Sequence, residues 1–318
     1  MAFDRRTIPA SARESLWHAA DGSAIRRLDW GEPGGNPAGV RGSILFMPGR
    51  GDAYEKYLET CEHWRRQGWR VTAADWRGQA GSGRLGSDGT TGHIDSFDRW
   101  IGDLGEFWRA WAAERDGPRV LAGHSMGGHL VLRAAGDHAL APEPDAIVLS
   151  APMLSFLPER VPAALKRALA AVMTRLGDPR RPAWRVSEKP GVSAAARPAL
   201  LTHDEARYAD EAWWKRARPE LAMGPGSWGW IAAAQASMRR MEAAGYLEAV
   251  RIPVFITATT ADRLVGWRAI ERAASRLPDC TLQMLGAEAR HEIFRECDPV
   301  RLRALAAVDA FLDRIAPA

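Results

Sequence analysis

The chain has 318 residues with 46% apolar content, which is enough to bury the core of one large domain or of two smaller ones. The formal net charge is +4 and only four of the 43 basic residues are lysines, so the lysine-rich blocks typical of nucleic-acid binding are missing and we expect no nucleic-acid partner. Three cysteines without a C-x-x-C spacing indicate neither a disulfide framework nor a zinc site.

The first half of the chain alternates short apolar runs with amphipathic stretches, which is typical of βα units on a mostly parallel sheet. It begins without the apolar segment of a secretory signal, and no apolar run approaches the roughly 20 residues that cross a membrane, so we expect a cytoplasmic protein. The expected elements are, in order, a hairpin at 14–30 that turns at Asp21-Gly22, a strand at 42–49, a helix at 53–67, a strand at 69–76, a helix at 96–114 and a strand at 119–125.

The interval from about 153 to 235 interrupts this alternation, because it lacks a convincing strand and is rich in proline, alanine, arginine and tryptophan. It follows an expected strand at 146–152. After it, the pattern predicts strands at 252–260 and 280–285, each followed by a helix, the last at about 299–315. The strand pattern therefore resumes on the far side of a long insertion.

We interpret residues 153–235 as a helical cap, inserted after the sixth strand between two parts of an α/β core, 1–152 and 236–318. Ligands of open α/β sheets bind at the carboxyl ends of the strands, which such a cap can cover. The alternative is a stabilising helical excursion without a site. The cap contains one amphipathic helix. Its apolar face consists of Leu165, Leu169, Val172 and Leu176.

A serine lies at the junction between the strand at 119–125 and the helix that follows it. The segment Gly123-His124-Ser125-Met126-Gly127 fits G-x-S-x-G, in which small neighbours let a strand turn sharply into a helix and expose the serine hydroxyl. Glycine is costly inside regular structure, so its repetition here indicates a backbone that turns or is approached closely. The alternative is an ordinary glycine-rich turn with a bystander serine.

A nucleophilic serine needs a histidine base and a carboxylate that orients it. With a serine at such an elbow, the acid and then the histidine follow in the loops after late strands. Asp262 comes directly after the strand at 252–260, and His291 lies in the loop after the next strand. Glu288 is a weaker alternative acid because it shares the loop of His291. The remaining histidines considered lie outside the expected late loop: His93, His129, His138 and His203.

Acyl transfer also needs backbone N–H donors for the oxyanion. One is expected from Met126, the residue after the serine, and the other from the loop after an early strand. Arg50 is the candidate in that loop because Gly49 and Gly51 let the backbone turn inward. The side chain of Arg50 has no part in this role.

Several motifs together resemble the lysophospholipase and monoacylglycerol-lipase-like (serine aminopeptidase-like) branch of the α/β hydrolases, in order and spacing and over nearly the whole chain. One departure is Pro48, where many relatives have histidine. These motifs are "FMPGRGDAYEKYLE", "DWRGQAGSGR", "GHIDSFDRWIGDL", "GHSMGGHL", "TTADRLV" and "RHEIFRE", and the cap stretches "LTHDEARYADEAWW" and "GPGSWGWIAAAQAS" resemble the bacterial lysophospholipase members.

The resemblance implies an α/β-hydrolase fold and a serine hydrolase in which Ser125 attacks an ester carbonyl, His291 transfers the proton and Asp262 orients the imidazolium, without a metal or an organic cofactor. It favours small-molecule lipid esters, lysophospholipids or monoacylglycerols, as substrates. Fold and triad do not fix the substrate, so a general carboxylesterase, a peptidase and an acyltransferase stay open. A binding protein without catalysis is a further alternative, which the intact triad argues against.

The cap is crowded with tryptophans that could wall an acyl channel, although aromatic residues in a cap also form its own core. We expect Trp213, Trp214 and Trp228 to contact the substrate. Arginines are dispersed along the chain and could attract anionic lipid. A transient, peripheral contact with the inner membrane therefore stays open for the expected cytoplasmic protein. The tryptophans of this group are Trp184, Trp213, Trp214, Trp228 and Trp230.

Overall fold

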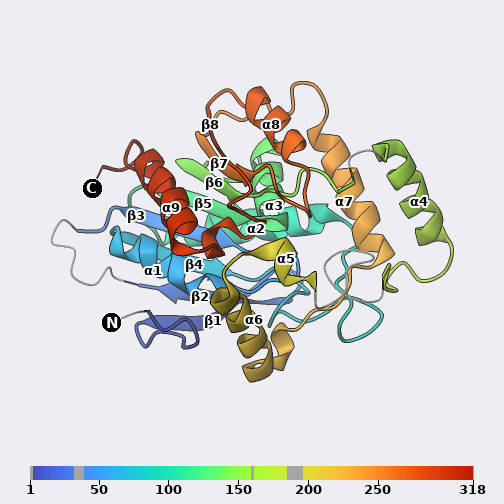
Figure 1. Cartoon of the computed structure of the whole chain (residues 1–318), viewed down its shortest axis with the longest axis horizontal. Helices are drawn as coiled ribbons and strands as arrows, with labels where there is room; N and C mark the ends of the chain where they lie inside the picture. The colour runs from blue at the N-terminus through green and yellow to red at the C-terminus, as the bar shows by residue number, and fades with distance from the viewer. Residues whose placement is uncertain (1–2, 32–38, 159–160, 185–195, 318) are drawn as a thin grey trace.

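The computed structural model describes residues 3–31, 39–158, 161–184 and 196–317. Its centre is an eight-stranded sheet with the order β1-β2-β4-β3-β5-β6-β7-β8, in which β1 pairs antiparallel with β2, β2 antiparallel with β4, and the other neighbours run parallel. Helices lie on both faces of this sheet (Figure 1). The strands are β1 (Ala12–His18), β2 (Ala24–Trp30), β3 (Gly42–Met47), β4 (Trp69–Ala74), β5 (Arg119–His124), β6 (Ala146–Ser150), β7 (Val254–Thr259) and β8 (Cys280–Leu285).

The core follows from the period of two along the central strands. In β3, Ile44 and Phe46 belong to one buried cluster, whereas Leu45 and Met47 belong to the other. Helices α2 (Phe97–Ala113), α3 (Met126–Gly136), α7 (Trp228–Met241) and α8 (Trp267–Arg276) cover the face of Leu45, and α1 (Leu58–Arg66) and α9 (Asp298–Leu312) cover the opposite face. Near-continuous apolar runs in the parallel strands are therefore explained by burial on both faces.

The predicted fold class is confirmed: an α/β-hydrolase architecture with a mostly parallel sheet and a helical insertion after β6. The predicted hairpin is the antiparallel pair of β1 and β2. The helix expected at 53–67 begins as a 3₁₀ turn, η1 (Tyr54–Tyr57), before α1 starts at Leu58. Element ends thus differ from the prediction by a few residues, as expected where helices begin in a tighter turn.

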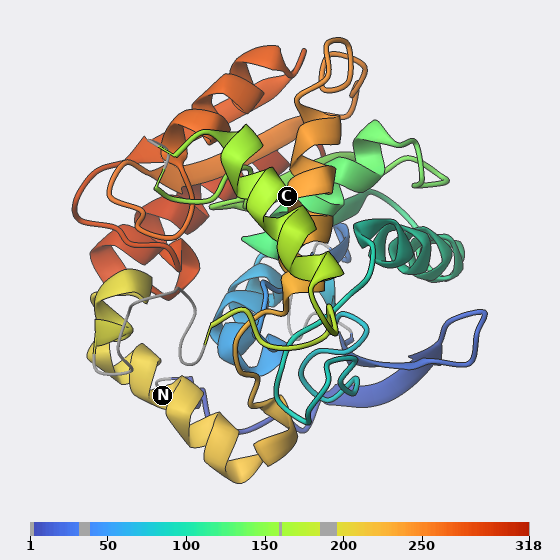
Figure 2. The same ribbon diagram turned by 90° about the vertical axis from the view of Figure 1, so that its right-hand side faces the viewer.

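Between β6 and β7 the described residues form α4 (Ala163–Arg175), α5 (Pro198–Leu201), α6 (Glu205–Ala217), the short η3 (Pro219–Leu221) and then α7. The predicted cap boundary at residue 235 falls inside α7. This helix packs one face against α2 and α3 in the core, so it belongs structurally with the sheet-covering helices. Helices α4 and α6 lie apart from each other at the edge of the sheet (Figures 1 and 2).

Helix α4 packs against α7, as Figure 2 shows, but its apolar stripe stays about half exposed. The one fully buried residue of α4 is Ala170, at 1% exposure, among the residues that the structure describes. The stripe that the sequence places on one face does not form a core. Its members are Leu165, Leu169, Val172 and Leu176, at 60%, 53%, 49% and 63% exposure.

Candidate active site

Ser125 lies at a sharp turn between β5 and α3, with φ 53° and ψ −117°, a conformation that is uncommon for a residue other than glycine. The flanking glycines are required by close approach. A Cβ at Gly123 would lie 2.8 Å from the backbone of Gly127, and a Cβ at Gly127 would lie 2.3 Å from the carbonyl oxygen of Met47. The G-x-S-x-G spacing therefore reflects three backbone segments packed together beneath the serine.

The backbone of Ser125 is held on both sides. Its N–H donates to the carbonyl of Ser150 at 2.9 Å, and its carbonyl accepts from the N–H groups of Met153 at 2.9 Å and His129 at 3.0 Å. These bonds fix the unusual dihedral angles, because strained conformations persist only where the surrounding structure determines them. The hydroxyl is therefore presented at the carboxyl end of the sheet.

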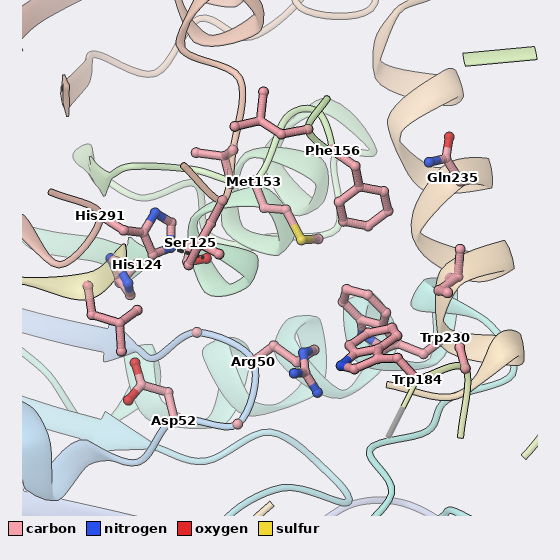
Figure 3. A pocket seen from close by; sticks show the side chains of 18 of the residues that line it. Arg50, Asp52, His124, Ser125, Met153, Phe156, Trp184, Trp230, Gln235 and His291 are labelled. Carbon is pink, nitrogen blue, oxygen red and sulfur yellow. Dashed lines mark hydrogen bonds between the residues drawn. The ribbon is translucent and has the colours of Figure 1, made fainter. Parts of the chain in front are cut away.

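The loops after β7 and β8 bring the predicted acid and base to this hydroxyl. His291 Nε2 lies 2.8 Å from Ser125 Oγ, and His291 Nδ1 lies 2.6 Å from Asp262 Oδ2. A carboxylate can only accept, so Nδ1 carries the proton that Asp262 accepts and Nε2 of the neutral ring is free to accept from the serine hydroxyl. The structure thus joins the three predicted residues in one hydrogen-bonded chain. Figure 3 shows His291 beside Ser125.

Both partners of the serine are buried and held from a second direction. Asp262 Oδ1 accepts the backbone N–H groups of Leu264 at 2.7 Å and Val265 at 3.0 Å, which fixes the carboxylate. Burial of His291 lowers its pKa, but the charge of Asp262 and the hydrogen bond to it outweigh burial, and the net effect raises the pKa above its ordinary value. The carboxylate thus favours the imidazolium that proton transfer from serine would create.

A second histidine borders the site without titrating. The ring of His124 lies 4.9 Å from that of His291, centroid to centroid. Burial, followed by the nearby charge of His291, holds the pKa of His124 well below its ordinary value. His124 is therefore neutral at pH 7 and adds no competing charge beside the chain of three residues.

The turn after β3 runs beside the serine. A Cβ at Gly49 would lie 3.2 Å from Cβ of Ser125, a tight contact that any larger residue would make at this position. Gly51 has φ 65°, and its N–H donates to Gln79 Oε1 at 2.8 Å, so that amide is already used for holding the turn. Met126 opens α3, and the first N–H groups of a helix have no acceptor within it. The turn that contains Arg50 and the start of α3 at Met126 therefore both adjoin Ser125, and the role of their N–H groups as oxyanion donors stays a prediction.

A cavity of about 410 Å³ opens from Ser125 and His291 toward the cap. Figure 3 shows Met153 and Phe156 on one side of it and the Arg50 side chain facing Trp184 and Trp230 on the other. The guanidinium of Arg50 lies 5.5 Å and 5.3 Å from the ring centres of these two tryptophans, within the range of cation–π contacts. The cavity is largely apolar, and its lining includes the charged residues Asp52, Lys56 and Glu292.

The prediction for two of the tryptophans is wrong. Trp213 and Trp214 do not line the cavity but form an edge-to-face pair with ring centres 4.9 Å apart. Trp214 Nε1 donates to the carbonyl of Arg5 at 2.9 Å, so this part of α6 packs against the N-terminal segment. Trp228 lines the cavity together with Trp184 and Trp230, and its contact with a substrate stays a prediction.

The alternative residues weighed from the sequence lie elsewhere. Glu288 is exposed and forms an ion pair with Arg303, so it does not compete with Asp262. Three of the other histidines form hydrogen bonds with residues outside the chain of Ser125, His291 and Asp262: His93 with Ser227 Oγ, His129 with Ser237 Oγ and His203 with Glu296. Sequence reasoning missed Phe156, Met153 and Lys56 as lining residues, because no motif of the sequence assigns them a catalytic or binding role.

An elbow serine at the carboxyl end of a mostly parallel sheet, hydrogen-bonded to a histidine and an aspartate from later loops, defines a serine ester hydrolase of the α/β-hydrolase class. The chain matches the family described as "Serine aminopeptidase, S33" over residues 38–298, and it belongs to that family. None of the helices that the structure describes combines the length and apolar character needed to cross a bilayer.

Two bacterial relatives are a lysophospholipase L2 and a probable lysophospholipase L2. The chain is 27% identical over 283 residues to lysophospholipase L2 of Escherichia coli strain K12, a match covering 85% of this chain and 80% of that protein. It is 23% identical over 282 residues to a probable lysophospholipase L2 of Haemophilus influenzae, covering 86% and 84%.

Solved structures share the fold. A soluble variant of monoglyceride lipase from Saccharomyces cerevisiae, in complex with a substrate analogue, has a TM-score of 0.78 at 20% identity, covering 99% of both chains. Monoacylglycerol lipase of Paleococcus ferrophilus has a TM-score of 0.69 at 22% identity, covering 92% of this chain and 99% of that one. These likenesses support the architecture from one end of the described chain to the other.

Proposed function

We propose that the protein hydrolyses carboxylic esters of lipids through an acyl-enzyme intermediate. Ser125 Oγ attacks the ester carbonyl, and His291 Nε2 takes its proton and then delivers it to the leaving alcohol. Asp262 holds the ring and stabilises the imidazolium. The observation that carries the proposal is the chain of hydrogen bonds, 2.8 Å and 2.6 Å long, at the inner end of an apolar cavity.

The tetrahedral intermediate needs donors aimed at its oxygen. We assign these to the backbone N–H groups of Arg50 and Met126, one on each side of Ser125. The Arg50 side chain instead forms part of the cavity wall, where it contacts Trp184 and Trp230. The same two amides receive the oxyanion again when water, activated by His291, attacks the acyl-enzyme.

We further propose lysophospholipids or monoacylglycerols as the substrates. The names of the bacterial relatives and of the structural neighbours, lysophospholipase and monoacylglycerol lipase, support this class. The cavity supports it too, since its walls of Met153, Phe156, Trp184 and Trp228 suit an acyl chain. Each buried methylene contributes roughly 0.8 kcal/mol, so such walls favour long acyl chains.

Labelling with a fluorophosphonate tests the chemistry, and a panel of esters tests the substrate class. We expect wild-type protein to be labelled and Ser125→Ala to be neither labelled nor active, with an unchanged circular dichroism spectrum. Covalent labelling of Ser125→Ala would overturn the nucleophile. A panel that varies acyl length and head group separates lipid esters from short carboxylic esters, peptides and acyl acceptors. Equal rates on acetate and long-chain esters would overturn the lipid assignment.

The exposed stripe of α4 supports a transient contact with a membrane surface. Leu169 lies both on this stripe and at the cavity, so the stripe reaches the cavity wall. Arg167 and Arg175 lie on the same helix and suit anionic head groups. Vesicles of phosphatidylglycerol should bind the wild-type protein more than the variant with Leu165→Ser and Leu176→Ser. Equal sedimentation of the two proteins with vesicles would contradict this contact.

A further inference from the structure

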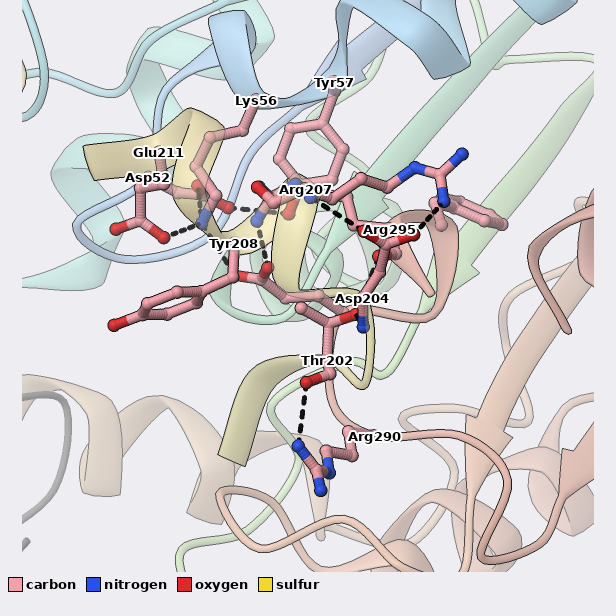
Figure 4. A network of polar contacts seen from close by, with 12 residues as sticks. Asp52, Lys56, Tyr57, Thr202, Asp204, Arg207, Tyr208, Glu211, Arg290 and Arg295 are labelled. Carbon is pink, nitrogen blue, oxygen red and sulfur yellow. Dashed lines mark hydrogen bonds and ion pairs between the residues drawn. The ribbon is translucent and has the colours of Figure 1, made fainter. Parts of the chain in front are cut away.

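A cluster of buried charges lies between the cap and the catalytic loops. At its centre is Lys56, whose side chain is 5% exposed. Its Nζ lies 2.7 Å from Asp52 Oδ1, 2.7 Å from Glu292 Oε1 and 3.2 Å from Glu211 Oε2. Figure 4 shows the ammonium of Lys56 between Asp52 and Glu211. One cation therefore binds three carboxylates at a largely buried position beside the cavity.

These three carboxylates come from three parts of the molecule. Asp52 follows the glycine turn that passes beside Ser125. Glu292 is the residue after His291. Glu211 belongs to cap helix α6. Lys56 itself belongs to η1. Its ammonium therefore joins three segments: the turn after β3 that carries Gly49, Arg50 and Asp52, called the oxyanion turn below, the loop of His291, and the cap.

The outer members of the cluster satisfy the remaining oxygens. Tyr57 donates its hydroxyl to Asp52 Oδ2 at 2.7 Å, and Arg197 donates to Glu211 Oε1 at 2.7 Å. Arg295 donates to the second oxygen of Glu292. Removing one partner from a buried ionic cluster leaves an uncompensated charge, which is far more costly than the cluster's net contribution to stability. The arrangement thus specifies geometry more than it adds stability.

Hydrogen bonds of the backbone follow the same path between cap and base. The N–H of Glu292 donates to the carbonyl of Leu201, at the end of α5, at 2.8 Å. Thr202 Oγ1 donates to the carbonyl of Arg295 at 2.8 Å, and Arg290 Nη1 donates to the carbonyl of Thr202 at 2.8 Å. Figure 4 shows the last of these contacts below the charged cluster. The loop of His291 is therefore built partly on cap residues.

We propose that Lys56 is a positioning residue, which holds the loop of His291 and the oxyanion turn in register with cap helix α6 by binding Glu292, Asp52 and Glu211 together. The inference rests on the role proposed for His291. Lys56 transfers no proton in this role. Its removal should disturb alignment of the base with Ser125 while the serine elbow, which is held by β5, β6 and α3, stays intact.

The charges that face His291 make this role measurable. Asp262 from the loop after β7, Glu292 from its own loop and Asp52 from the oxyanion turn all raise the pKa of His291. The neighbouring ring of His124 is neutral, and Lys56 faces Asp52 and Glu292 together with Arg295. Loss of the Lys56 charge leaves these carboxylates less neutralised, so the pKa of His291 should rise further.

The test compares Lys56→Met with Lys56→Arg on a short nitrophenyl ester, with Arg303→Met as a control that removes one exposed positive charge from a surface pair. We expect Lys56→Met to lower kcat by about tenfold or more, since small misplacements of a base are costly. The acid limb of kcat/KM should move upward by about half a pH unit or more. Lys56→Arg should recover most of kcat, and Arg303→Met should match the wild type.

A wild-type kcat and an unshifted acid limb in Lys56→Met would overturn the proposal, as would an effect confined to KM. If Lys56→Met does not fold, Glu211→Gln decides, because it removes only the cap's carboxylate. A reduced kcat in folded Glu211→Gln supports the coupling, and a wild-type kcat overturns it. Inactivity of Ser125→Ala, measured beside these variants, separates a failure of this inference from a failure of the proposed mechanism.

Discussion

The α carbon of Gly127 faces the carbonyl oxygen of Met47, which a Cβ at that position would meet at 2.3 Å. The contact joins the start of α3 to the end of β3, directly beneath Ser125. Because the obstacle is backbone, no side-chain rotation can relieve it. The glycine is thus a condition for bringing the serine elbow and the oxyanion turn together.

We therefore expect Gly127→Ala to lower the free energy of unfolding by about 1–3 kcal/mol or more and to abolish activity. The matched control is Gly102→Ala, inside α2, where a Cβ meets nothing within 4 Å. That change should be neutral or stabilise the protein by about 0.5–1 kcal/mol. Urea unfolding measures both. An active Gly127→Ala variant with wild-type stability would contradict the packing described here.

The acid of the triad should be indispensable for turnover but not for the fold. Asp262→Asn keeps the size of the side chain but favours the wrong tautomer of His291, and it should lower kcat by about 10⁴. Glu288→Gln, on the loop of His291, should leave kcat unchanged because Glu288 pairs with Arg303 at the surface. Steady-state kinetics on one nitrophenyl ester decide between the two carboxylates. A loss of less than about tenfold in Asp262→Asn would remove it from the proposed mechanism.

The pH dependence of kcat/KM should report the pKa of the buried His291. Attack by Ser125 requires the neutral imidazole, and Asp262 raises the pKa at which that form appears. Activity should therefore fall as the pH drops through a value above the ordinary histidine pKa of about 6.5. A profile of kcat/KM between pH 4 and pH 9, measured on a substrate without ionisable groups, locates the midpoint; a midpoint below about 6 would contradict the assignment.

Selectivity for chain length should depend on the tryptophans of the cavity and not on those of α6. Trp184→Ala and Trp228→Ala should reduce the preference for a long acyl ester over a butyrate by about tenfold, the loss of roughly two methylene contacts. Trp213→Ala is the control, because Trp213 packs against Trp214 away from the cavity. The readout is the ratio of kcat/KM for the two esters. An equal loss in all three variants would make these tryptophans structural.

The convergence of the candidate catalytic residues could be predicted because each of them follows the end of a strand. Parallel strands present their carboxyl ends at one edge, so Ser125, Asp262 and His291 converge once the strands are known. The cap is different. Helical periodicity distinguishes the apolar face of α6 from its polar face, but it does not show which neighbour each face contacts. The hydrogen bond from Trp214 to the carbonyl of Arg5, for example, joins residues that lie far apart in the sequence.

The exposed stripe of α4 shows the same limit. Its periodicity predicts an amphipathic helix, and the structure has this helix. The sequence pattern does not indicate, however, whether the apolar face packs against protein or against another surface. Lys56 carries even less signal, since a single lysine in a polar stretch is ordinarily solvated. Only the arrival of Glu211 from α6 and of Glu292 from the late loop turns it into a buried centre.

The attachment of the cap divides it into two parts with different freedom to vary. The segment of α4 contacts α7 and borders the cavity, so its sequence can diverge, or be exchanged by design, with consequences mainly for which lipid enters. The segment of α5 and α6 shares hydrogen bonds and ion pairs with the loop of His291. A chimera that takes α4 from a relative should keep its turnover. A chimera that takes the whole cap would place foreign α5 and α6 against its own His291 loop, so the contacts that support His291 would no longer match.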